Sequence, residues 1–226
     1  MRIISKSRTN ALARLLAGVM LTAAFLPGID RLEAAEDSHG LVDTRSRWSC
    51  NFGVGIIGDT SAPGDYYKFD FDTAWGAGEG RTYNFSINYR LHEFDWKIGK
   101  QRFQPQLELP MMLTLVDEEE LALFPDYNAG LMFRWRDWPW SRTVYTTFAI
   151  GLGVSYSSKV WTFDKQRHPG EYRAHLKFWL PIELTFAHPK SQQHQIMLFI
   201  DHQSGAHITD EGGQDAWGIG YRYNFE

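Results

Sequence analysis

Residues 194–205 read HQIMLFIDHQSG, and residues 214–225 read QDAWGIGYRYNF. Hydrophobic side chains occupy every second position over most of both stretches, and small or polar side chains lie between them. This period of two is typical of β-strands that have one apolar and one polar face. Residues 143–158 alternate in the same way, with a mostly apolar face that runs from Val144 to Tyr156.

Working outward from these stretches, we find the same alternation in ten segments and expect an all-β fold, an eight-stranded antiparallel transmembrane β-barrel. Because ten segments exceed eight strands, we expect some neighbours, such as 81–91 and 93–99, to form one bent strand. Turn-forming residues separate the segments, and the acidic run 117–120 is interpreted as a solvated loop rather than a calcium site. The candidate strands are 50–58, 66–76, 81–91, 93–99, 103–116, 126–136, 143–158, 172–187, 194–205 and 214–225.

Periodicity alone does not distinguish a barrel in lipid from a soluble barrel with an apolar interior. Three features favour lipid. Arg222 and Asn224 fall on the face that would line a wet lumen, tryptophans at 135, 138 and 140 gather at a turn as interfacial aromatics do, and the last strand ends on Phe225. A soluble periplasmic lipid-binding barrel is the alternative.

The N-terminal residues 1–35 are expected to be a secretory signal, and residues 36–226 the outer-membrane barrel domain. Basic residues precede the apolar stretch 15–26 (LLAGVMLTAAFL), and small residues offer a cleavage site near Ala35. The apolar stretch is shorter than the roughly 20 residues that a spanning helix needs. We therefore expect export and location in the cell outer membrane, with an uncleaved anchor as the alternative.

Charge and cysteine content narrow the function classes. The chain carries a formal net charge of −4 at pH 7, and the expected signal is its basic part, so nucleic acid is not an expected partner. The single cysteine, Cys50, excludes an intrachain disulfide and a thiolate metal cluster. The histidines show no paired metal-ligand spacing, so we expect neither a metal nor a cofactor.

The apolar face of 194–205 ends on two residues that carry chemistry, His202 and Ser204. Ionisable groups on a lipid-facing surface are costly, so their presence there suggests a function. On the next strand Asp215 has the parity of the apolar residues, so it is expected to point outward beside them. A hydroxyl, an imidazole and a carboxylate would then converge as nucleophile, base and orienting acid. Asp210 and Glu211 are alternative acids.

The end of the sequence resembles the PagL family of lipid A deacylases. The resemblance lies in His202-Gln203-Ser204, then Gly213-Gln214-Asp215, then the aromatic strand from Trp217 to Phe225. The resemblance implies an eight-stranded outer-membrane barrel and a serine carboxylic-ester hydrolase. Its substrate would be lipid A of lipopolysaccharide, from which it removes the 3-O-linked hydroxyacyl chain without a cofactor. It also implies that His202 is the base, Ser204 the nucleophile and Asp215 the acid, on the barrel exterior at the outer leaflet.

Two positions depart from the family pattern. The family carries an asparagine directly after the serine that helps to form the oxyanion hole, and this chain has Gly205 there. An oxyanion hole would therefore use the backbone N–H groups of Gly205, Ala206 and His207, or water. The acid is aspartate rather than glutamate. The alternative function is a non-enzymatic outer-membrane barrel, structural or a small-solute pore, in which these side chains form a polar rim.

Overall fold

The computed structural model describes residues 46–58, 80–99, 101–118, 122–167 and 169–225. The expected signal over 1–35 and the candidate strand 66–76 lie outside these ranges. Within them, no helix combines the length and the hydropathy that a membrane-spanning helix needs.

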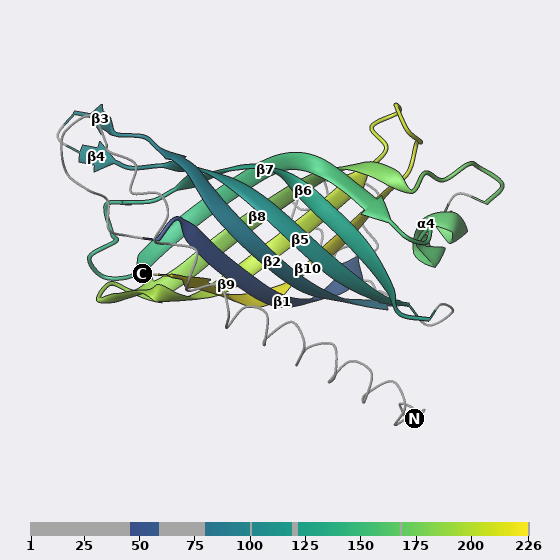
Figure 1. The fold of residues 1–226 in the computed structure, drawn as a ribbon, viewed down its shortest axis with the longest axis horizontal. Helices are drawn as coiled ribbons and strands as arrows, with labels where there is room; N and C mark the ends of the chain where they lie inside the picture. The colour runs from purple at the N-terminus through teal and green to yellow at the C-terminus, as the bar shows by residue number, and fades with distance from the viewer. Residues whose placement is uncertain (1–45, 59–79, 100, 119–121, 168, 226) are drawn as a thin grey trace, which may run out of the picture. The chain divides into compact units, whose positions relative to one another are not determined.

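Eight antiparallel strands close into a barrel in the order β1-β10-β9-β8-β7-β6-β5-β2 (Figure 1). Each strand pairs with its neighbour along the chain, and β1 closes the ring by pairing with both β2 and β10. The expected eight-stranded antiparallel barrel is confirmed. The strands are β1 (Trp48–Gly58), β2 (Gly80–Glu93), β5 (Gln106–Glu118), β6 (Phe124–Trp135), β7 (Tyr145–Ser157), β8 (Leu176–His188), β9 (Ser191–Ser204) and β10 (Gly213–Asn224).

The segment 93–99 was expected to continue 81–91 as one bent strand, but it does not. β2 ends at Glu93, and the short strand β3 (Trp96–Ile98) pairs instead with β4 (Gln101–Phe103) in a separate hairpin. Gly99 turns this hairpin with a φ of 63°, a left-handed conformation that glycine adopts without a steric penalty. The hairpin thus enlarges the connection between β2 and β5.

Asp117 and Glu118 of the acidic run 117–120 belong to β5 instead of the expected solvated loop, and residues 119 and 120 lie outside the described ranges. Glu118 is buried, and its carboxylate accepts hydrogen bonds from the backbone N–H groups of Thr162 (2.7 Å) and Phe163 (3.2 Å). These residues begin the helix α4 (Thr162–Arg167), which lies in the β7–β8 connection. The first N–H groups of a helix have no partner within the helix, so Glu118 satisfies them from outside.

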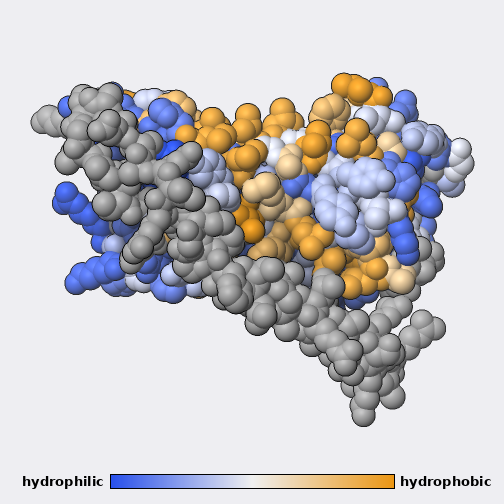
Figure 2. All heavy atoms as spheres, viewed as in Figure 1, coloured by the Kyte–Doolittle hydropathy of each residue, from blue (hydrophilic) through white to orange (hydrophobic). Residues whose placement is uncertain are grey.

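The barrel is apolar outside and polar inside. On β7, Ile150, Leu152 and Val154 point outward with exposed fractions of 40%, 62% and 51%. The next residue, Ser155, points inward and is buried. Figure 2 shows hydrophobic side chains across the middle of the visible face and hydrophilic ones toward both ends. This distribution is the reverse of a soluble barrel and matches a surface that faces lipid.

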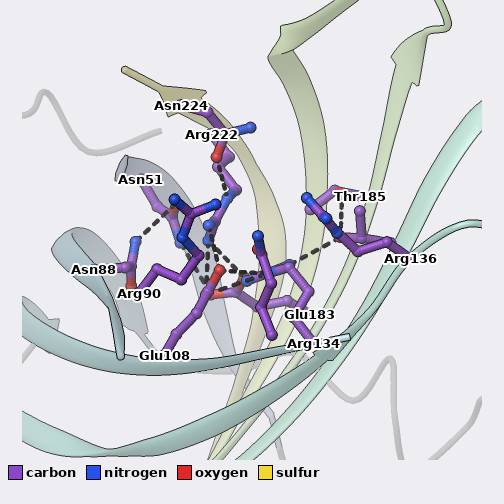
Figure 3. A network of polar contacts seen from close by, with 12 residues as sticks. Asn51, Asn88, Arg90, Glu108, Arg134, Arg136, Glu183, Thr185, Arg222 and Asn224 are labelled. Carbon is purple, nitrogen blue, oxygen red and sulfur yellow. Dashed lines mark hydrogen bonds and ion pairs between the residues drawn. The ribbon is translucent and has the colours of Figure 1, made fainter. Parts of the chain in front are cut away.

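Buried charges cross the lumen (Figure 3). Arg134 donates to Glu108 (3.1 Å) and to Glu183, and Arg222 donates to the same Glu108 (2.7 Å). Asn51 donates to Glu183 at 2.9 Å. The five residues come from β1, β5, β6, β8 and β10, so the network ties opposite walls of the barrel together. An open pore for solutes would require these ion pairs to break.

Candidate active site

The register of β9 and β10 brings the expected catalytic residues to one place. His202 lies opposite Asp215, and Ser204 lies opposite Gly213. Residues directly opposite each other in an antiparallel pair share a face of the sheet. Along β9 the odd residues such as Asp201 are buried toward the lumen, while the even residues point outward. The side chains of His202, Ser204 and Asp215 therefore lie on the exterior. They are at the opposite end of the barrel from Trp48, which begins β1, and Asn224, which ends β10.

His202 and Asp215 form a close pair, with 2.7 Å between Nδ1 and Oδ1. The side chains are 16% and 3% exposed, so the pair is largely shielded from water. An ionised carboxylate accepts hydrogen bonds but cannot donate them, so the imidazole N–H on Nδ1 points at Asp215. With Nδ1 as the donor, a neutral imidazole would present Nε2 as the acceptor, which is the arrangement that a general base requires.

Ser204 lies beside this pair but is not bonded to it. In the part of the chain that the structure describes, no hydrogen bond joins Ser204 Oγ to His202. A Cβ built on Gly213 would lie 3.5 Å from Ser204 Cβ and 3.6 Å from His202 Cε1, so the glycine borders both side chains. Hydrogen bonds between catalytic groups are often long without substrate and shorten in the complex. In the sequence, Gly213 can be recognised as a neighbour of the site by its position two residues before Asp215.

The loop that follows Ser204 is held by its own backbone. The N–H of Gly205 donates to Gly212 O (2.9 Å), and the N–H of His207 donates to Asp210 O (3.1 Å). The N–H groups of Gly205 and His207, two of the three expected oxyanion donors, are thus bonded within the loop. Of the three, only Ala206 has an N–H without a partner among the described residues. Ala206 and His207 both have positive φ, 50° and 58°, which is a strained conformation for residues other than glycine.

Asp210 explains why residue 205 is a glycine. A Cβ on Gly205 would lie 2.1 Å from Asp210 Oδ1, closer than atoms can approach, so no larger residue fits in this loop conformation. The carboxylate accepts hydrogen bonds from the backbone N–H of Gly212 (2.9 Å) and Ala174 (2.8 Å), and it pairs with Lys177 (3.2 Å). Asp210 is thus committed to the loop, whereas Asp215 bonds the histidine.

Apolar side chains flank His202, Ser204 and Asp215 on the outer wall. On β8, Phe178 lies opposite Ser204 and Leu180 opposite His202, and both share their outward face. Farther from the loops, the outward residues of β9 are Ile200, Leu198 and Ile196, the last two being exposed. An extended hydrocarbon chain lying along the wall from Ser204 would contact these side chains. No group of three or more histidine, cysteine, aspartate or glutamate side chains suited to a metal ion occurs within the described ranges.

Comparison with known proteins finds similarity at the level of the fold. No family model matches the chain, and no curated protein matches it by sequence. One solved structure, described as the crystal structure of the outer membrane enzyme PagL, superposes with a TM-score of 0.51 at 13% identity. The match covers 78% of this chain and 99% of that one. The chain therefore shares the fold of that eight-stranded outer-membrane barrel.

Proposed function

We propose that this protein is an outer-membrane esterase that removes the 3-O-linked hydroxyacyl chain of lipid A. The observation that carries the proposal is the outward-facing pair of His202 and Asp215 next to Ser204, on a surface that is otherwise apolar. The PagL-type fold and the family resemblance of the 202–215 pattern support the choice of substrate. A site on the outer wall suits a substrate that is itself part of the membrane, because the lipid reaches it laterally.

In the proposed reaction, Ser204 Oγ attacks the carbonyl carbon of the acyl ester while His202 Nε2 takes the hydroxyl proton. Asp215 holds the imidazole in place and stabilises the positive charge that forms on it. The tetrahedral intermediate collapses when His202 returns the proton to the sugar oxygen, leaving the acyl group on Ser204. Water then attacks the acyl-enzyme, and His202 again serves first as base and then as acid. The products are the free hydroxy fatty acid and the deacylated lipid.

The negative oxygen of the intermediate needs hydrogen-bond donors. The N–H of Ala206 is the candidate donor, since the N–H groups of Gly205 and His207 bond within the loop. The loss of a single oxyanion donor typically lowers kcat by about 10²–10³-fold. We therefore expect a slower enzyme than one that also has a side-chain donor after the serine.

Mass spectrometry of lipid A tests the proposal. The wild-type protein, produced in a Gram-negative host, is expected to yield lipid A that lacks one 3-hydroxyacyl chain. Ser204→Ala should yield unmodified lipid A while it still shows the heat-modifiable migration of a folded barrel. Ser191→Ala is the matched control, because this serine begins the same strand at the far end of the barrel. Unmodified lipid A with folded wild-type protein, in cells and in detergent micelles, would refute the proposal.

A further inference from the structure

The β3–β4 hairpin has two chemically different sides. Trp96 pairs with Phe103 across the hairpin, and Lys97 pairs with Arg102. Side chains alternate between faces along a strand, so Ile98 joins Trp96 and Phe103 on one side, and the two basic residues lie on the other. Trp96 and Ile98 are 42% and 66% exposed, so this side of the hairpin presents apolar surface to its surroundings.

Aromatic rings attach the hairpin to the outside of the barrel. Trp96 stacks on Phe133 of β6, with 5.6 Å between ring centroids and 26° between planes, and Phe94 contacts the same ring at 5.6 Å. Phe133 packs against Trp135, which packs against Phe148 on β7. Phe133, Trp135 and Phe148 have the outward parity of the apolar surface. The apolar side of the hairpin is thus continuous with the lipid-facing wall.

Polar contacts fix the hairpin's base. Phe94 donates its N–H to Pro105 O (2.8 Å), and Arg136 donates to Gln104 O (2.9 Å). Asp137 accepts the N–H of Gln104 at 3.1 Å. The bonds from Arg136 and Asp137 connect the hairpin to the β6–β7 turn, so they fix its orientation relative to the barrel wall. Its position is the barrel end that carries Trp48 and Asn224, where outer-membrane barrels normally have short turns.

We propose that the β3–β4 hairpin is a membrane anchor that lies in the interface of the periplasmic leaflet. Trp96, Ile98 and Phe103 insert among the acyl chains. Lys97 lies at the level of the phosphates, together with Arg102, which is paired with Asp95 (2.6 Å). Amphipathic segments with tryptophan on one side and basic residues on the other bind interfaces of this kind, more strongly when the lipid is anionic. The inference rests on the proposed membrane location and is independent of the esterase chemistry.

Site-specific labelling tests the anchor. In a Cys50→Ser background, Ile98→Cys and Lys97→Cys carry the environment-sensitive fluorophore NBD, one on each side of the hairpin. Leu152→Cys, on the wall at mid-strand and 62% exposed, is the matched control for barrel insertion. Each full-length protein is reconstituted into vesicles of phosphatidylethanolamine and phosphatidylglycerol, and its emission is compared with and without brominated lipids.

The label at 98 is expected to show blue-shifted emission and quenching by brominated lipid, while the label at 97 is quenched more strongly by aqueous iodide. If the label at 152 is quenched by lipid but the label at 98 behaves like that at 97, the anchor proposal is wrong and the membrane barrel stands. If none of the labels, including that at 152, responds to lipid, the membrane location itself is wrong. A label at 98 that is shielded from both quenchers would indicate a protein contact and would also overturn the anchor.

Discussion

Replacing Asp215 with asparagine removes one negative charge from the proposed site and changes the size of the side chain little. Asp215 is 3% exposed, and its Oδ1 lies 2.7 Å from His202 Nδ1, so the charge acts at short range with little solvent screening. With charge centres about 4 Å apart and an effective dielectric constant of about 20, the carboxylate stabilises the imidazolium by roughly 4 kcal/mol. We expect Asp215→Asn to lower kcat by about 10³-fold, since about 1.4 kcal/mol corresponds to a tenfold change in rate.

The assay measures release of hydroxy fatty acid from lipid A in detergent micelles at saturating substrate. Asp201→Asn is the matched control, because Asp201 is a buried carboxylate next to His202 in sequence but faces the lumen, where it accepts hydrogen bonds from Asn84 (2.6 Å) and Trp179 (3.2 Å). It should retain most of the wild-type kcat. Equal rates for Asp215→Asn and the wild type would show that Asp215 is not the acid. An equally large loss in both variants would point to a fold defect.

Three further substitutions test the loop after Ser204, the lumen network and the barrel wall. Gly205→Asn introduces the asparagine that the PagL family carries after its serine, but it places a Cβ 2.1 Å from Asp210 Oδ1. It should therefore lower kcat by about 10²-fold rather than raise it, as measured in the micelle assay. Arg134→Met removes one of the two arginines that pair with Glu108 and also the arginine that donates to Glu183, and it should lower the free energy of unfolding by about 3–5 kcal/mol in urea titrations. Gly153→Val puts a Cβ 2.2 Å from a backbone oxygen of β6, so the heat-modifiable folded form should be lost on gels.

The alternation of residue types predicted most of the barrel because lipid and lumen impose opposite demands on successive side chains of a strand. The long run 143–158 and the pair 194–205 and 214–225 were assigned within a few residues. The sequence did not separate the β3–β4 hairpin from β2. The alternation of residue types is the same whether a strand pairs with other barrel strands or forms a separate hairpin. The helix α4 was missed because its six residues are too few to show a helical period, and its start depends on Glu118, which is distant in sequence.

At the candidate site, parity alone placed His202, Ser204 and Asp215 on one face, and the register then set His202 opposite Asp215. The state of the loop was not predictable in this way. Which amide of a loop remains free depends on hydrogen bonds such as that from Gly205 N–H to Gly212 O, and these depend on the loop's φ values rather than on residue type.

The central claim is that a serine on the outer wall of the barrel is an activated nucleophile. Treatment of the folded wild-type protein with a fluorophosphonate, followed by peptide mass spectrometry, tests it directly. A covalent adduct is expected on Ser204, and it should be absent in His202→Ala. Modification of a different residue, or adduct formation at Ser204 that is unchanged without the histidine, would contradict it.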